Sequence, residues 1–187
     1  MANFENRMAL GMVELSSIAR GYETADLLVK EAHVELLMCR SICSGKFMIL
    51  FCGDVDAVES SVARGVEVAA HAWVDSFVIP DVHPGVLGAI RGTSMPTTRE
   101  AMGVVESFSV SSLIEGLDAA CKEASIELVD VRLAMALGGK AYLTLTGPLA
   151  DVRAAVGAAV DVIARKGLLV DQTIIPNPRE EIYREII

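Results

Sequence analysis

The chain contains the same sequence pattern twice, and this internal repeat constrains the fold more than any other feature. Residues 9–14 (ALGMVE) match residues 101–106 (AMGVVE), and the same offset of 92 carried over residues 9–40 gives 13 identities in 32 pairs. The matched positions include Gly, Lys, Asp and Glu in the same order, which two unrelated apolar segments would not preserve. A chain of 187 residues therefore reads as two copies of one unit of about 90 residues.

The offset between the copies grows along the chain. It rises first to 94 and then, at Pro80 and Pro176, to 96, so the second copy carries two small insertions. A cluster of Gly, Thr, Ser and Pro over residues 91–99 is typical of a linker. We therefore expect two domains, residues 1–92 and residues 93–187.

Strand-like and helix-like segments alternate in the same order in both copies. Apolar runs and periodic apolar faces predict these limits. In the first copy we expect strands at 8–15, 34–42, 46–52 and 73–79, helices at 16–32 and 55–70, and a short helix after Pro84. In the second copy we expect strands at 101–108, 126–135, 140–146 and 168–175, helices at 110–124 and 149–166, and a short helix from Pro178. The order β-α-β-β-α-β-α predicts a compact α/β unit in each copy.

The composition excludes several classes of protein. Apolar residues make up 52% of the chain, so it must bury a large core and is not disordered. A net charge of −9 and scattered basic residues argue against a nucleic-acid partner. No apolar stretch is long enough to predict a membrane span, and the N-terminal sequence has no secretory pattern. We expect a reducing compartment, where structural disulfides are rare.

No set of residues predicts catalysis. The three histidines, His33, His71 and His83, are far apart and have no Cys or carboxylate at metal-ligand spacing. A G-x-S-x-G nucleophile motif is missing from the sequence. Glu14 and Glu106 occupy matching strand ends, which indicates a shared requirement of the fold. We therefore do not expect an enzyme.

Several motifs of the repeat resemble the bacterial microcompartment (BMC) shell domain. These are the A-[LM]-G-x-V-E strand, the helix ending in K-E-A, the Gly-Lys turn and the strand closing in Ile-Pro. Two copies in one chain resemble the tandem-domain shell proteins, and residues 41–47 (SICSGKF), 137–140 and 166–170 resemble the subfamily of propanediol-utilisation compartments. The resemblance implies two tandem BMC domains (an α+β architecture), each an antiparallel sheet flanked by helices. It also implies a homotrimer whose six domains form a pseudo-hexagonal tile of a microcompartment shell in the bacterial cytoplasm.

The same resemblance implies a site at the centre of the tile, where the loops between the second and third strands meet. Cys43 of each chain is implied to ligate one [4Fe–4S] cluster per trimer. The implied pore-lining residues are Ile42, Ser44, Gly45, Lys46, Ala136, Leu137, Gly138 and Gly139. Lys30 and Lys122 are implied to lie at the tile edge. The implied partners are other shell proteins and an encapsulated or cytosolic redox protein.

The number of available thiols is a separate argument about this site. An iron–sulfur cluster is usually bound by four thiolate ligands. Cys39 and Cys43 lie four residues apart near one expected strand, so their Cα atoms are roughly 13 Å apart and both cannot easily reach one small cluster. Three-fold symmetry would instead supply three copies of Cys43 and leave one iron open to water or a donor protein. Cys39, Cys52 and Cys121 read as buried thiols.

Other interpretations stay open at this point. Cys43 can also be read as a small apolar residue at a turn. In that case the tile holds no cluster, and its central pore conducts small metabolites. A third hypothesis is a duplicated metabolic enzyme or regulator with a saturable ligand site. A brown colour after anaerobic purification favours the cluster. A colourless trimer that forms sheets favours the pore, and a monomer or dimer that binds a ligand favours the enzyme or regulator.

Overall fold

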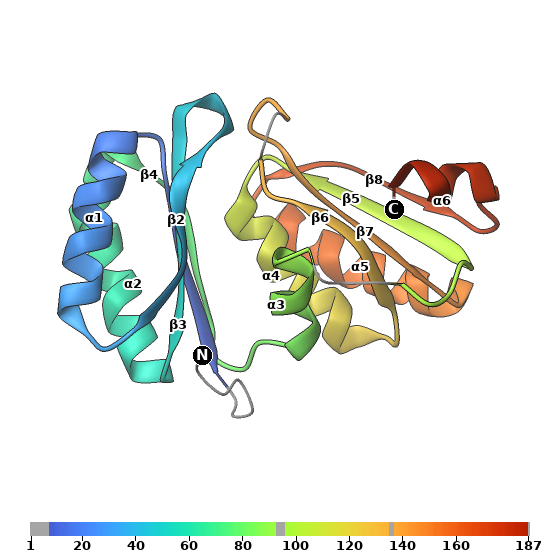
Figure 1. The fold of residues 1–187 in the computed structure, drawn as a ribbon, viewed down its shortest axis with the longest axis horizontal. Helices are drawn as coiled ribbons and strands as arrows, with labels where there is room; N and C mark the ends of the chain where they lie inside the picture. Colours follow the sequence, from blue (N-terminus) through green and yellow to red (C-terminus); the bar gives the residue numbers. More distant parts are fainter. Residues whose placement is uncertain (1–7, 93–95, 135–136, 187) are drawn as a thin grey trace. The chain divides into compact units, whose positions relative to one another are not determined.

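A computed structural model describes residues 8–92, 96–134 and 137–186 of the chain. The chain divides into two compact units, the first ending at Val82 and the second beginning at His83. Each unit is a four-stranded antiparallel sheet with helices packed on it (Figure 1).

The first unit has the strand order β2-β3-β1-β4, with β1 and β3 at the centre of the sheet. Two helices pack on each other and on the sheet, where they enclose an apolar core that includes Phe47, Phe51 and Val58. Its elements are β1 (Ala9–Leu15), α1 (Ile18–Glu31), β2 (Glu35–Ile42), β3 (Lys46–Gly53), α2 (Val55–Ala69) and β4 (Trp73–Ile79).

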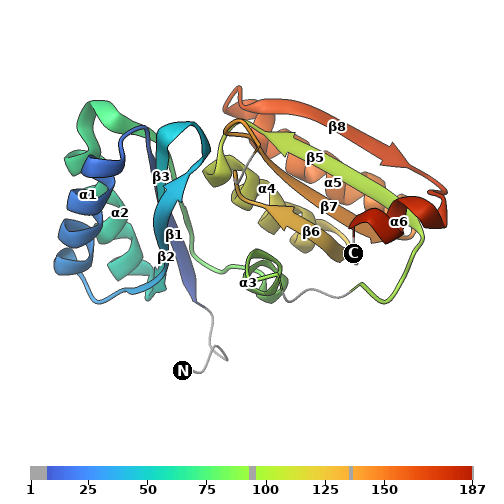
Figure 2. The same cartoon turned by 45° about the horizontal axis from the view of Figure 1, so that its top comes forward.

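The second unit has the matching strand order β6-β7-β5-β8. Its elements are α3 (Pro84–Ile90), β5 (Ala101–Ser107), α4 (Val110–Glu123), β6 (Glu127–Arg132), β7 (Ala141–Gly147), α5 (Leu149–Arg165), β8 (Leu169–Ile175) and α6 (Glu180–Ile186). Figure 2 shows α4 and α5 on one face of this sheet and α6 on the other. Tyr183 of α6 packs there against Met102 and Val129. The short helix α3 packs against β6 and α4, although it precedes the boundary expected at residue 92.

The expected order of elements is confirmed along the chain, and most limits agree within two residues. The final helix expected in the first copy, α3, belongs to the second unit. The offset between equivalent elements locates the two insertions. It is 92 at both ends of α1 and α4, 94 at the start of α2 and α5, and 96 for β4 and β8. One insertion therefore lies in the β6–β7 connection, and the other lies between the start of α5 and the start of β8.

Serine caps fix the starts of the equivalent helices α1 and α4. The Ser17 hydroxyl accepts a hydrogen bond from the Arg20 amide, and the Ser109 hydroxyl accepts one from the Ser112 amide. These bonds satisfy main-chain donors that the first helical turn leaves without partners. Both helices thus begin at equivalent positions.

A single carboxylate holds the segment that precedes β5. Glu127 on β6 accepts hydrogen bonds from the Thr97 hydroxyl at 2.6 Å and the Thr98 amide at 3.0 Å. These bonds, that from the Thr97 side chain above all, hold the pKa of Glu127 below its ordinary value of 4.5. The lowered pKa means that this contribution to stability is complete above about pH 4.5 and is lost as the pH falls through the folded-state pKa.

We expect Glu127→Gln to release this segment. The amide of Thr98 should exchange its hydrogen severalfold faster at pH 7 in the variant, because a neutral amide oxygen accepts hydrogen bonds more weakly than a carboxylate. Hydrogen exchange followed by mass spectrometry measures the change, with Glu123→Gln on the exposed end of α4 as the control. Equal exchange in the variant and the parent protein would contradict the role given to Glu127.

Candidate functional site

The turn between β2 and β3 places Cys43 at the tip of a hairpin. Residues Cys43–Gly45 form a short 3-10 turn in which Ser44 (φ 64°) and Gly45 (φ 72°) are both left-handed. This conformation costs a non-glycine residue roughly 1 kcal/mol. A Cβ atom built on Gly45 would meet no atom of the chain within 4 Å, and Cys43 is partly exposed. The turn therefore carries a partly exposed thiol.

The second unit builds the equivalent turn without a thiol. Gly138 (φ 61°) and Gly139 (φ 87°) repeat the left-handed pair, and the Lys140 amide donates to the Leu137 carbonyl at 3.1 Å. Leu137 thus takes the place that Cys43 has in the first unit. Each chain presents one thiol turn and one aliphatic turn.

The other residues predicted to line a pore occupy different environments. Ile42 and Gly139 are buried, Ser44, Gly45 and Gly138 are exposed, Leu137 and Lys46 are half-buried, and Ala136 lies outside the described residues. A pore of this kind needs several chains, so the lining role of these residues stays a prediction.

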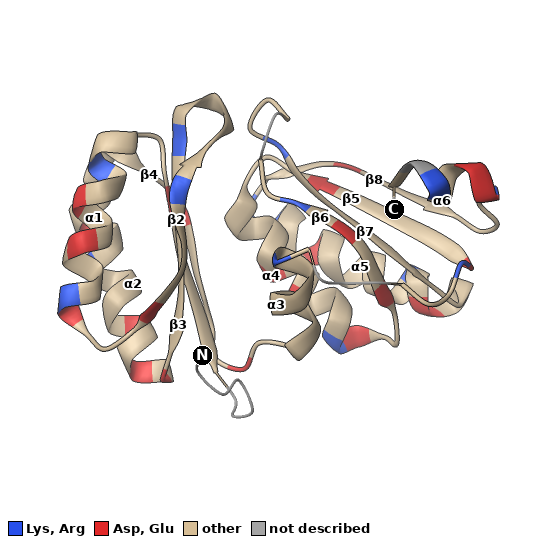
Figure 3. Ribbon diagram, viewed as in Figure 1, with Lys and Arg blue, Asp and Glu red and all other residues tan. Residues whose placement is uncertain are grey.

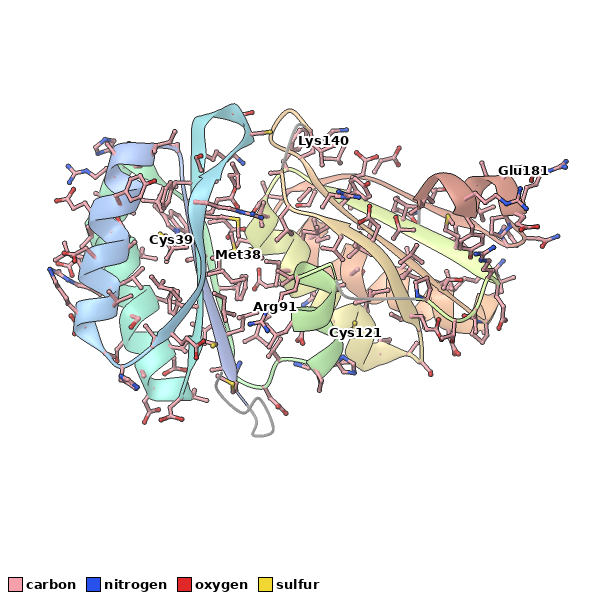
Figure 4. All side chains as sticks on the ribbon, in the orientation of Figure 1. Met38, Cys39, Arg91, Cys121, Lys140 and Glu181 are labelled. Atoms are coloured by element: carbon pink, nitrogen blue, oxygen red, sulfur yellow. The ribbon has the colours of Figure 1, made fainter. Side chains whose placement is uncertain are left out.

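Lysines that close the two turns reach back to the central strands of the sheets. Lys46 Nζ lies 2.9 Å from Glu14 Oε1 on β1, and Lys140 Nζ lies 2.7 Å from Glu106 Oε2 on β5. Figure 4 shows Lys140 beside the turn between β6 and β7. Sequence reasoning did not pair these residues, although a Glu and a Lys repeated at matching positions are a usable signal. The two ion pairs hold the base of each turn.

The two ion pairs differ in burial, which predicts different effects on stability. Glu14 is fully buried and Lys46 largely so, whereas Glu106 and Lys140 are each exposed by a third or more. Lys46→Met leaves a buried carboxylate without this cation and should lower the free energy of unfolding by about 3 kcal/mol. Lys140→Met should cost less than about 1 kcal/mol, because water screens that pair. Urea unfolding of both variants measures the difference, and equal losses would contradict it.

The remaining cysteines lie in places unsuited to ligand binding. Cys39 on β2 packs against the core of the first unit, and burial raises its pKa. Cys52 on β3 is buried. Burial, with help from the Asp118 charge, raises the pKa of Cys121 on α4 to about 12 (Figure 4). Of the three thiols predicted to be buried, Cys52 is, whereas Cys39 and Cys121 are only partly buried. Their raised pKa values disfavour the thiolate, which is the form that binds metal.

The donor set of one chain fits a metal centre if several chains share it. Within the described ranges, no group of three or more His, Cys, Asp and Glu side chains is arranged to hold a metal ion. Cys43 combines a thiol and partial exposure at the tip of a hairpin. Three such turns meeting at a symmetry axis would supply three thiolates to an iron–sulfur cluster, whose usual ligands are cysteines.

Lys30 and Lys122, the predicted edge residues, occupy the last turns of α1 and α4. Each forms an ion pair with the aspartate four residues earlier, Asp26 or Asp118. Figure 3 shows acidic and basic residues interleaved along α1, so these charges compensate one another locally. Among the residues that the structure describes, every helix is too short or too polar to cross a bilayer.

Comparison with known proteins gives consistent matches over nearly the whole chain. The BMC domain model matches residues 9–82 and 101–178. The chain is 41% identical over 179 residues to the bacterial microcompartment shell protein PduT of Citrobacter freundii, covering 96% of this chain and 97% of that protein. It is also 40% identical over 62 residues to the carboxysome shell protein CcmK2 of Thermosynechococcus vestitus, covering 33% of this chain and 61% of that protein.

Two solved structures extend the comparison. A microcompartment protein from Desulfitobacterium hafniense superposes with a TM-score of 0.85 at 44% identity, covering 96% of this chain and 99% of that one. A fused permuted hexameric shell protein of the RMM microcompartment superposes with a TM-score of 0.67 at 23% identity, covering 88% of this chain and 87% of that one. The second likeness concerns the fold alone.

Proposed function

The chain belongs to the BMC-domain family of bacterial microcompartment shell proteins, and on that premise we propose that three copies form one pseudo-hexagonal shell tile. The expected fold class, two tandem BMC domains each with an antiparallel sheet and flanking helices, is confirmed. Two units with the same strand order supply two similar sectors per chain, so three chains supply six. Similarity to a shell protein over 96% of the chain supports placement in a shell in the bacterial cytoplasm.

We further propose that the three Cys43 thiolates of the tile hold one [4Fe–4S] cluster. The observation that carries this is the matched pair of turns, of which one bears Cys43 and the other Leu137 at the equivalent place. Such a cluster supplies one-electron transfer when it is bound. The left-handed turn orients the Cys43 sulfur, and the Glu14–Lys46 pair holds its base. In this proposal the tile passes electrons across the shell, or transfers clusters, to an encapsulated or cytosolic redox protein.

A second function rests on a different observation, the chemistry of the turn tips. Ser44, Gly45 and Gly138 are exposed and uncharged. The nearby Lys46 and Lys140 ammonium groups bind carboxylates of the sheet. An opening surrounded by such tips would present small, neutral groups. This suits a cluster-free tile whose central pore conducts small metabolites.

The edges of the tile would meet other shell proteins. Lys30 and Lys122 lie in the last turns of equivalent helices. Lys30 is largely exposed and Lys122 is partly exposed. We propose that they contact neighbouring tiles.

Anaerobic purification and reconstitution with iron and sulfide test the cluster proposal. We expect a trimer with a broad visible absorption and an iron–sulfur EPR signal, holding one cluster for every three chains. A trimer that stays colourless after reconstitution would contradict the cluster and favour the pore. A monomer would contradict both functions, since each requires turns from several chains.

A further inference from the structure

The two short helices α3 and α6 are equivalent parts of the repeat. Both have seven residues, both follow the last strand of a repeat, and the offset of 96 holds at their first and last residues. Although α3 belongs to the first repeat of the sequence, it packs in the second unit, against β6 and α4 (Figure 1). The segment that follows one repeat thus covers the next repeat.

Contacts made by α3 define what this segment covers. Val86 is fully buried, and the main-chain amide of His83, just before the helix, donates to Asp118 Oδ1 of α4 at 2.7 Å. The Asp118 side chain is 8% exposed. On β6, Leu128 is 7% exposed. An apolar patch and one buried carboxylate oxygen together receive the segment.

The first unit carries the same patch and carboxylate, but they are open. Asp26, the equivalent of Asp118, is 56% exposed, and Leu36, the equivalent of Leu128, is 41% exposed. Lys30 binds Asp26 Oδ2, just as Lys122 binds Asp118 Oδ2. In the described part of the chain, no group donates a hydrogen bond to Asp26 Oδ1. The surface is therefore built for a segment that one chain does not supply.

Helix α6 carries an apolar side chain that the second unit leaves uncovered. Tyr183 fixes it to the sheet of the second unit through hydrogen bonds to Thr146 Oγ1 at 2.7 Å and to the Glu100 carbonyl at 3.1 Å. Ile182, the equivalent of the buried Val86, is left 47% exposed. A large apolar side chain thus faces outward from α6.

We propose that residues 177–186 of one chain pack on α1 and β2 of a second copy. The main-chain amide of Arg179, equivalent to that of His83, donates to Asp26 Oδ1, and Ile182 covers Leu36. Each chain offers this segment once and the receiving surface once, so the contact runs head-to-tail from chain to chain. Three such contacts close a ring of three chains. The inference rests on the trimer proposed above and names the residues that close it.

Paired cysteines test this contact against a matched internal control. In D26C/R179C the bridge would join two chains, whereas in H83C/D118C the equivalent bridge would lie within one chain. Mild oxidation should give covalent dimers and trimers of the first variant on a non-reducing denaturing gel. The second variant should run as a bridged single chain, and D26C and R179C alone should show no ladder. All four variants also carry C43S, so that the Cys43 thiols of the tile cannot cross-link the chains.

Assembly measurements separate failure of this contact from failure of the proposed function. If sedimentation shows a trimer and H83C/D118C forms its bridge, but D26C/R179C gives no ladder, this contact is overturned and the tile stands. If the parent chain is a monomer, the tile itself is overturned. Ile182→Glu supplies a second readout, because it should raise the dissociation constant of the trimer at least tenfold with unchanged circular dichroism. An unchanged dissociation constant would also overturn the contact.

Discussion

Replacing Cys43 with serine should reduce the iron and sulfide bound after anaerobic reconstitution to less than a tenth of the parent level. The reason is that each chain offers one thiol at a hairpin tip, so the substitution removes all three protein ligands of a shared cluster at once. A serine hydroxyl is a far weaker ligand for iron in such clusters than a cysteine thiolate. Iron and sulfide analysis, with EPR spectra of the reduced sample, measures the loss.

The chain offers two matched controls for this experiment. Cys39→Ser and Cys121→Ser remove thiols that burial keeps protonated, and both variants should retain the cluster. In the double variant C43S/L137C, the thiol moves to the equivalent turn of the second unit and should restore cluster binding. Full cluster content in C43S, or equal loss in the Cys39 variant, would refute ligation by Cys43.

Enlarging Gly21 and shrinking Phe47 together should show a coupling of about 2 kcal/mol between their effects on the free energy of unfolding. Gly21 is the fourth residue of α1, and glycine within a helix is unfavourable by about 1 kcal/mol. Its presence is explained by Phe47, whose ring atoms would lie 2.3 Å from a Cβ at this position. The equivalent positions of the second unit hold Leu113 and Ala141, both fully buried. A small-large pair in one unit therefore corresponds to a large-small pair in the other.

A double-mutant cycle measures this coupling. Gly21→Leu alone should destabilise by about 3 kcal/mol through overpacking, and Phe47→Ala alone by about 3–5 kcal/mol through the cavity it leaves. Together they should cost about 2 kcal/mol less than their sum, because the leucine fills the space that the ring vacates. Combining Gly21→Leu with Leu143→Ala in the second unit is the additive control. Additivity of the Gly21 and Phe47 substitutions would contradict the packing described.

The repeat made most of the fold predictable from the sequence. Each limit could be checked at two places, so the order of strands and helices and the turns before Lys46 and Lys140 followed from local patterns. The left-handed backbone at Ser44-Gly45 and Gly138-Gly139 was found only in the structure. The serine caps are also local interactions, since the Ser17 hydroxyl accepts a hydrogen bond from an amide only three residues away. Local interactions of this type leave a signal within a short window of sequence.

Long-range polar contacts could not be predicted in the same way. The ion pair of Glu14 with Lys46 spans 32 residues, and the bond of Thr97 to Glu127 spans 30. Both depend on which strands become neighbours, which no local pattern specifies. The packing of α3 on β6 and α4 is likewise a contact between distant segments, which its local sequence does not specify.

Native mass spectrometry of the anaerobically reconstituted protein counts chains and cluster in one particle. We expect a complex of three 19.9-kDa chains carrying the mass of one four-iron, four-sulfide cluster. C43S should give the same complex without that added mass. A dominant single chain, or a cluster bound to one chain alone, would contradict the account.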